Sequence, residues 1–304
     1  ALIVFGYGVV AFEDVVNSGV IHGLKVVAVA VVAQAVWAMA KTMCPDTKRV
    51  TVAVLATIAV LAIPMPFVQV GVIVFGGVVG LIFFRAETRS EHVSLGINVS
   101  QRLAVASLVL FFAGLIGLPM LAAAYPSHTL ALVDSFYRSG SLVFGGGHVV
   151  LPLLQSEVVP YGWVSNDGFL AGYGAAQAVP GPLFTFAAYL GTVLNPQPNG
   201  VVGALICLLA IFAPSFLLLV AALPYWQLLR SRAPLRAALS GVNAAVVGLL
   251  LAAFIDPVWA TSVKIPTDLA IAGVAAALLL WKKVPVWLIV LLTAAAGTVL
   301  APGV

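Results

Sequence analysis

Two short runs decide the fold of this chain: Phe144-Gly145-Gly146-Gly147-His148 and, further along, Gln177-Ala178-Val179-Pro180-Gly181-Pro182. Each run interrupts an apolar segment with residues that break helices. Three consecutive glycines make helix formation entropically costly. A proline lacks an N–H and disfavours helix in the residue before it. The meaning of these breaks depends on the solvent around them.

The composition indicates that this solvent is lipid. Of 304 residues, 62% are hydrophobic and 8% are charged, and the mean hydropathy is +1.16. Too few polar side chains exist to cover a water-soluble domain. In a bilayer, irregular backbone survives only where it is buried in protein or lines a cavity, and paired broken helices indicate a transporter's substrate site. We predict an all-α polytopic membrane protein with inverted-topology repeats and broken or re-entrant helices.

Hydropathy predicts the membrane spans along the chain. They cover about 1–12, 20–40, 50–63, 67–84, 103–124, 200–228, 237–256, 266–281 and 284–301. The region 128–195 is less regular. It either crosses the bilayer twice or forms re-entrant loops, and both alternatives keep 200–228 running inward.

Basic residues predict the orientation, because cytoplasmic loops of membrane proteins are rich in Lys and Arg. Four loops can share one side, carrying Lys41, Lys48, Arg49, Arg85, Arg89, Arg102, Arg230, Arg232, Arg236, Lys282 and Lys283. These loops also account for the net charge of +4, so nucleic acid is not expected as a partner. We predict a multi-pass membrane protein with these loops on the cytoplasmic side.

A weak internal repeat accompanies this orientation. Sliding the chain by about 218 residues places Gly23-Leu24-Lys25 on Gly241-Val242-Asn243 and the span 67–84 on 285–302. The acidic pair Glu13-Asp14 then stands where arginines cluster in the second copy. Span 20–40 therefore runs inward and span 237–256 runs outward, which defines an inverted-topology repeat.

The first break offers candidate groups for an anion. Asp134 and Arg138 have helical i, i+4 spacing and can form a salt bridge; alternatively, the Arg138 fork binds an anionic substrate. Glu157 is either an interfacial carboxylate or, if buried, a carrier of a coupling proton. A helix that restarts at His148 would present free N–H groups and a partial positive charge. His148 itself is a candidate proton carrier or anion donor, or it merely starts the helix.

The second break repeats this logic. A helix over 168–179 should end at Pro180-Gly181-Pro182, and Pro182 can open the next helix with Thr185 in its first turn. Tyr173 and Gln177 lie four residues apart on one helix face and supply neutral hydrogen-bonding groups. Buried polar groups in a membrane need partners, and the substrate is a candidate partner.

The chemistry of both breaks favours a tetrahedral oxyanion. The sequence shows no acidic cluster suited to a divalent cation, no His/Cys set for zinc, and no GxSxG or HExxH motif. We therefore expect no catalytic residue, metal or cofactor. The candidate substrate-binding and transport residues gather at the breaks, with one more on span 237–256. They are Arg138, Phe144, Gly145, Gly146, Gly147, His148, Tyr173, Gln177, Pro180, Gly181, Pro182, Thr185 and Asn243.

Three strings resemble the chromate ion transporter family. They are SLVFGGGHVVLPLL at 141–154, LAGYGAAQAVPGPLFTF at 170–186, and GVNAAVVG at 241–248 followed by DPVW at 256–259. The likeness extends from about residue 100 to the end, and the upstream part resembles the close of a preceding domain. The resemblance implies a two-domain protein with homologous inverted halves that exports chromate, by antiport driven by the membrane potential or proton gradient, with sulfate as competitor.

On this resemblance, 1–84 is the end of a first domain, 85–102 is a cytoplasmic linker and 103–304 is a second domain. The chain begins without Met inside an apolar stretch, so an N-terminal part is expected to be missing. The expected partners are chromate or sulfate, a coupling proton and the lipid bilayer, and a homo-oligomer stays open. Two other classes compete with transport. An intramembrane enzyme would need a nucleophile–base pair or metal set, and a structural scaffold would leave the paired breaks unexplained.

Overall fold

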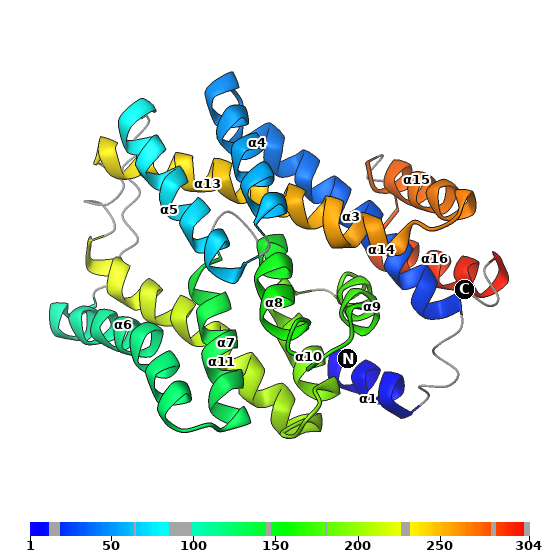
Figure 1. Cartoon of the computed structure of the whole chain (residues 1–304), viewed down its shortest axis with the longest axis horizontal. Coiled ribbons are helices and arrows are strands. Elements are labelled where there is room, and N and C mark those ends of the chain that lie inside the picture. Colours follow the sequence, from blue (N-terminus) through cyan, green and yellow to red (C-terminus); the bar gives the residue numbers. More distant parts are fainter. Residues whose placement is uncertain are drawn as a thin grey trace.

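The computed structural model describes residues 1–11, 19–63, 65–84, 99–143, 147–179, 181–225, 232–280 and 284–300, and all regular structure within them is helical (Figure 1). In chain order the elements are α1 (Leu2–Ala11), α3 (Gly19–Met43), α4 (Thr47–Ala62), α5 (Pro66–Phe83), α6 (Gln101–Ala124), α7 (His128–Ser141), η1 (Gly147–Val149), α8 (Val150–Val158), α9 (Asn166–Ala176), η2 (Leu183–Thr185), α10 (Phe186–Val193), α11 (Gly200–Ala222), η3 (Leu223–Tyr225), α13 (Ala233–Ala253), η4 (Phe254–Trp259), α14 (Ala260–Ser262), α15 (Pro266–Leu280) and α16 (Val286–Leu300).

Each predicted span coincides with a helix. Within the described residues, four helices are long and apolar enough to cross a membrane: Gly19–Met43, Gln101–Ala124, Gly200–Tyr225 and Ala233–Ser262. Their outer faces are apolar, as at Met120 and Leu209, which are 68% and 70% exposed. Lipid accepts such faces, whereas water does not. The all-helical fold predicted from the sequence is confirmed, and the chain is a multi-pass membrane protein.

Short polar side chains fix the starts of several helices. Asp46 before α4, Ser100 before α6 and Ser165 before α9 each accept a hydrogen bond from the backbone N–H three residues further on. The first N–H groups of a helix have no partner within the helix, so a capping side chain satisfies one of them. Such caps set where the helices begin, and packing decides how they assemble.

The inverted repeat is visible in the order and direction of the helices. α3 is followed by the pair α4 and α5, and α13 with its short extensions η4 and α14 is followed by the pair α15 and α16. The two long helices contact each other and run in opposite directions (Figure 1). The two triplets therefore have inverted topology, as the slide of the sequence on itself predicts.

The two repeats exchange their packing partners. α3 packs mainly on α15 and α16, whereas α13 packs mainly on α4 and α5. Gly23 of α3 lies against Gly297 of α16, and Gly241 of α13 lies against Gly80 of α5, so closely that an added Cβ would collide with the opposite helix. Small residues allow helix backbones to approach each other in a membrane. The same contact thus occurs twice, and each repeat completes the core of the other.

Candidate transport site

The first break lies at the tip of a re-entrant hairpin. α7 leads into it, and η1 with α8 leads back. Arg138 Nη2 of α7 lies 2.9 Å from Glu157 Oε2 of α8. At the open end, the His128 ring packs edge-on against Trp163, with 4.9 Å between ring centroids. Both ends of the segment therefore lie at the same depth, and the chain direction reverses between α7 and α8.

The second break forms a second hairpin beside the first. The Tyr189 hydroxyl of α10 donates to the Gly168 carbonyl oxygen of α9 at 2.9 Å. Beyond α10, the Asn195 N–H donates to the Trp163 carbonyl oxygen at 3.0 Å. Trp163 thus joins the open ends of both hairpins. Of the two alternatives that the sequence left for 128–195, the structure has the re-entrant one, and both hairpins enter from the same side.

Both tips lie at the depth of the membrane interior. α7 has 14 residues, which is about 21 Å at 1.5 Å per residue, against about 30 Å for the hydrocarbon core. Gly140, near the end of α7, touches the backbone of Ile211, which stands midway along the spanning helix α11. The end of α7 therefore lies level with the middle of the spanning helix α11, at a depth where a chain that leaves its helix must be buried in protein or line a cavity.

His148 and Tyr173 join the two tips. The His148 Nδ1 atom of η1 lies 2.8 Å from the Tyr173 hydroxyl of α9. Tyr173 is fully buried, and its ring packs edge-on against Phe186 of α10. This hydrogen bond fixes the orientation of the imidazole, so the other ring nitrogen, Nε2, is left for a further partner. Two candidate residues from different breaks are thus brought together.

Gln177 stands one turn beyond Tyr173, where α9 ends. Its Nε2 atom is buried and has no hydrogen-bond partner among the described residues. Leaving a buried amide donor unpaired costs about 1–3 kcal/mol. Such a group is expected where a ligand supplies the missing acceptor. Gln177 is therefore the described tip residue that most directly indicates a bound acceptor.

Backbone conformation shapes the second tip. Gly181 has a φ of +149°, a conformation that side-chain-bearing residues rarely adopt. Pro182 follows and precedes η2, and the Thr185 Oγ1 hydroxyl donates to the Pro182 carbonyl oxygen at 2.8 Å. Thr185 therefore holds the turn that starts α10, while its oxygen lone pairs stay able to accept.

Arg138 lies in the last turn of α7, between two carboxylates. Its Nη2 atom is 2.8 Å from Asp134 Oδ2 and 2.9 Å from Glu157 Oε2. The salt bridge that the i, i+4 spacing allows is present, and Glu157 adds a second partner from α8. Glu157 is 8% exposed, so it is buried rather than interfacial. The guanidinium charge is thus already compensated within the protein.

The remaining candidates lie in several places. Gly147 begins η1, whereas Phe144, Gly145, Gly146 and Pro180 lie outside the described residues. Asn243 is half-buried on α13.

The repeat equivalent of Asn243 on α3 is Lys25. Lys25 is buried, and its Nζ atom lies 3.1 Å from Asp167 Oδ1 in the first turn of α9. Through this ion pair the long helix of the first repeat holds the second hairpin.

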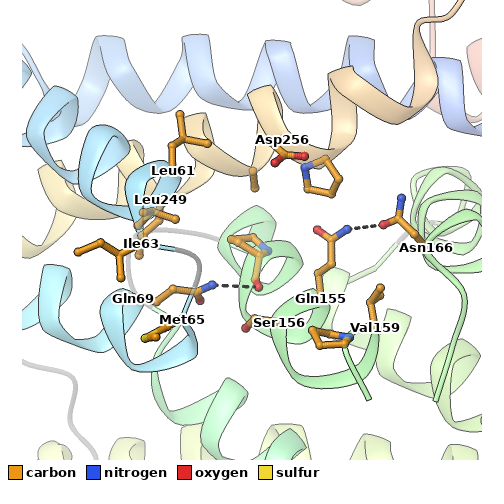
Figure 2. Close-up of a pocket in the computed structure, with 15 residues that line it drawn as sticks. Leu61, Ile63, Met65, Gln69, Gln155, Ser156, Val159, Asn166, Leu249 and Asp256 are labelled. Atoms are coloured by element: carbon orange, nitrogen blue, oxygen red, sulfur yellow. Dashed lines mark hydrogen bonds between the residues drawn. The ribbon is translucent and has the colours of Figure 1, made fainter. Parts of the chain in front are cut away.

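A cavity of about 430 Å³ lies beside the hairpins, between the α4–α5 turn, α8 and the end of α13. Figure 2 shows its polar groups, with Gln155 Nε2 donating to Asn166 Oδ1 at 2.7 Å and Gln69 Nε2 approaching the Pro152 carbonyl oxygen at 3.5 Å. Asp256 also lines it, at the point where the helical φ and ψ angles of α13 and η4 are interrupted.

Gln69, Gln155 and Asn166 are not among the candidate residues at the two breaks. Gln69 is a single amide within the apolar span 67–84, and intramembrane polar residues are candidates for function by default. That signal was visible in the sequence. The assembly of Gln69 with Gln155 and Asn166 was not, because it depends on contacts between distant helices.

The described residues contain no group of three or more His, Cys, Asp or Glu side chains that could hold a metal ion. What they do contain is an inverted repeat and two re-entrant hairpins whose tips meet through His148 and Tyr173. Discontinuous helices that meet at the midplane in this way are the architecture of a secondary transporter. The chain belongs to the chromate transporter family: residues 130–298 match the family described as Chromate transporter.

Curated relatives agree with this family. A probable chromate transport protein of Synechococcus elongatus is 30% identical over 60% of this chain and 48% of its own length. Chromate transport proteins of Pseudomonas aeruginosa and Cupriavidus metallidurans are 30% and 31% identical, over 57% and 55% of this chain and 42% and 41% of their own lengths. The chain thus spans less than half the length of these relatives. No solved structure matches.

Proposed function

We propose that this protein exports chromate from the cytoplasm across the bacterial inner membrane, by antiport coupled to another ion. The observation that carries the proposal is the junction of the two tips, where His148 bonds Tyr173 and the buried Gln177 amide has no partner in the part of the chain that the structure describes. The names of the relatives supply the substrate, since three of them are chromate transport proteins or a probable one. The proposed antiport follows from the resemblance of the sequence to the family.

The tips suit a tetrahedral dianion. The second helix of each hairpin begins at its tip, η1 with α8 in the first and η2 with α10 in the second. Helix starts present free N–H groups and a partial positive charge. The Gln177 amide and the His148 imidazole add side-chain donors that need no formal charge. A site of neutral donors holds an anion loosely enough to release it, which transport requires.

Each candidate residue has a proposed role. Gln177 and His148 donate to the oxyanion, Tyr173 positions His148, and Gly181 with Pro182 shapes the second tip. Thr185 holds the start of α10, and Asn243 is a candidate substrate contact on the long helix α13. Arg138 fixes α7 to α8. Gly147 begins η1, and Phe144, Gly145, Gly146 and Pro180 stay candidates by their place in the sequence of the two breaks. The proposed roles are those of binding and positioning; no chemical step is involved.

Sulfate transport is the second candidate. Sulfate has the same tetrahedral shape and charge as chromate, and donors at the tips would bind its oxygens in the same way. Selectivity between the two anions rests on small differences in size and hydration.

The experiment is uptake of labelled chromate by inverted membrane vesicles that carry the full-length protein, with sulfate as competitor and with an uncoupler. Gradient-dependent uptake that sulfate inhibits supports oxyanion export. If vesicles that contain the protein take up sulfate but no chromate, sulfate is the transported anion and the second candidate holds. Vesicles that take up neither anion would contradict both.

A further inference from the structure

We propose that Asp134, Arg138 and Glu157 form a proton-binding site, and that Glu157 carries the proton that couples transport. The inference rests on the proposed transport function and names the coupling group. Asp134 stands one turn before Arg138 on α7, and Arg138 and Glu157 line a cavity of about 240 Å³ between α5, α7 and α8. Four residues of its lining carry the argument: Gln69, Ser139, Ser156 and Glu157.

The charges of this cluster do not balance when both acids are ionised. One guanidinium nitrogen serves both carboxylates, at 2.8 Å and 2.9 Å. Asp134 and Glu157 are each 8% exposed. Two negative charges and one positive charge leave a net charge of −1 at membrane depth, where an uncompensated charge is costly. Binding one proton removes it.

The surroundings supply no second cation among the described residues. The helices that pack on α7 and α8 carry three described charges, Arg102, Asp167 and Arg236, each in the first turn of its helix. Asp167 pairs with Lys25 of α3, and none of the three forms an ion pair with the cluster.

The histidines of the two hairpins are also engaged elsewhere. His148 bonds Tyr173, and His128 packs on Trp163. From α5 the cavity receives the neutral amide of Gln69. Protonation of the cluster is therefore the available way to neutralise it.

The geometry favours a proton over a metal cation. The guanidinium stands between the two carboxylates and takes one oxygen from each, so a cation cannot bridge them. A proton adds to a single oxygen. Ser139 lines the same cavity, is 1% exposed, and its Oγ has no hydrogen-bond partner among the described residues. This unpaired hydroxyl indicates that a further polar species, such as a proton-carrying water, occupies the cavity.

A route leads to the cluster. Gln69 and Ser156 line both this cavity and the larger one of about 430 Å³. Both are labelled in Figure 2, on the side of the larger cavity that faces α5 and α8. A hydronium ion that enters the larger cavity passes these two side chains and gives its proton to a Glu157 carboxylate oxygen, and a water molecule remains. Release of the proton reverses the step.

Protonation at Glu157 can act on the substrate site through α8. This helix carries Glu157 at its end and follows directly on η1, which carries His148. A neutral Glu157 loses its ion pair with Arg138, and the restraint that joins α8 to α7 weakens. The helix is then free to move the tip that holds the anion. The coupling is thus a direct mechanical link between one carboxyl group and one imidazole.

Infrared difference spectroscopy of the purified full-length protein tests the proton site without any anion. Acidification should produce the carbonyl stretch of a protonated carboxyl group. This band should be absent in Glu157→Gln, and shifted but present in Glu157→Asp, which keeps a titrating group. A spectrum without a titrating band, or a band that persists unchanged in Glu157→Gln, would overturn the proposal.

Chromate transport in proteoliposomes, with the membrane potential clamped at zero, tests the coupling. A difference of one pH unit across the membrane corresponds to about 1.4 kcal/mol per coupled proton. It should therefore change the ratio of the chromate concentrations on the two sides by up to about tenfold per coupled proton. Glu157→Gln should still exchange labelled for unlabelled chromate but should ignore the pH gradient. The proposal is contradicted if chromate transport by Glu157→Gln still responds to the pH gradient. It is also contradicted if a sodium gradient drives chromate transport in the wild type and no longer does so in this variant.

The two tests separate the inference from the transport function. If wild-type protein exchanges no chromate while the Glu157-dependent band is present, the proposed substrate is wrong and the proton site stands. If chromate exchanges and no such band exists, the substrate stands and the proton site is wrong.

Discussion

The Nδ1 atom of His148 and the hydroxyl of Tyr173 lie 2.8 Å apart, although 25 residues separate them and each belongs to a different re-entrant hairpin. Within the described residues, this side-chain hydrogen bond links the two tips. It orients the imidazole of His148, and one turn beyond Tyr173 the Gln177 amide has no hydrogen-bond partner among the described residues. The proposed substrate site is built around this contact, and the predictions below test its parts.

Tyr173→Phe should lower the rate of chromate transport by about tenfold, because the loss of one positioning hydrogen bond is worth about 1 kcal/mol or slightly more. The measurement is initial uptake by proteoliposomes. Tyr189→Phe is the matched control: Tyr189 is also fully buried with one hydrogen bond, but that bond joins α10 to α9 below the tip. Equal loss of transport in both variants would contradict a positioning role.

Gln177→Leu should leave the protein as stable as wild type or raise its stability by about 1 kcal/mol, because it removes an unpaired buried donor. The same variant should lose most chromate transport. Gln155→Leu is its counterpart, since it leaves Asn166 without its 2.7 Å partner and should destabilise the fold. Thermal unfolding in detergent gives the stabilities. A destabilised Gln177→Leu would contradict the assignment of its amide to the substrate.

Gly181→Ala should destabilise the second tip by about 1–3 kcal/mol, because its φ of +149° lies in a region that alanine avoids. Gly117→Ala in α6 is the control: that glycine has open space around the added Cβ, and alanine is the better helix former. A thermal shift assay should show a lower Tm for the first variant and an equal or higher Tm for the second. An unchanged Tm in Gly181→Ala would show that the tip tolerates other conformations.

Gly241→Val and Gly23→Val should both destabilise the protein strongly, by about 3 kcal/mol or more, because each places a side chain against the backbone of the opposite helix. The two losses should be similar if the exchanged packing of the repeats is equivalent. Gly273→Ala in α15, where the added Cβ meets open space, should have little effect. If only one of the two valine variants lowers the stability of the protein, the contacts of the two repeats are not equivalent.

The sequence predicted the helices because hydropathy over a helix length is a local property. It predicted the breaks because glycine runs and Pro-Gly-Pro act on their own backbone. The inverted repeat was visible in Gly23 and Gly241, which occupy the same close contact in the two triplets. The division at 85–102 stays a prediction, since 85–98 lies outside the described residues.

What the sequence left open depends on contacts between distant residues. Asn195 and Trp163 decide that both segments are re-entrant, and neither side chain type indicates this. Glu157 is the second partner of Arg138, 19 residues away across a hairpin, so helical spacing identified only Asp134. Gln177 was a candidate from its position, but its unpaired amide is a property of the packed structure.

The most direct test of the central claim is a cryo-electron microscopy map of the full-length protein with bound chromate. The predicted result is density for the oxyanion between the two tips, within hydrogen-bonding distance of His148 Nε2 and Gln177 Nε2. Density for chromate beside Arg138, or at another depth with the tips empty, would contradict the claim that the paired breaks hold the substrate.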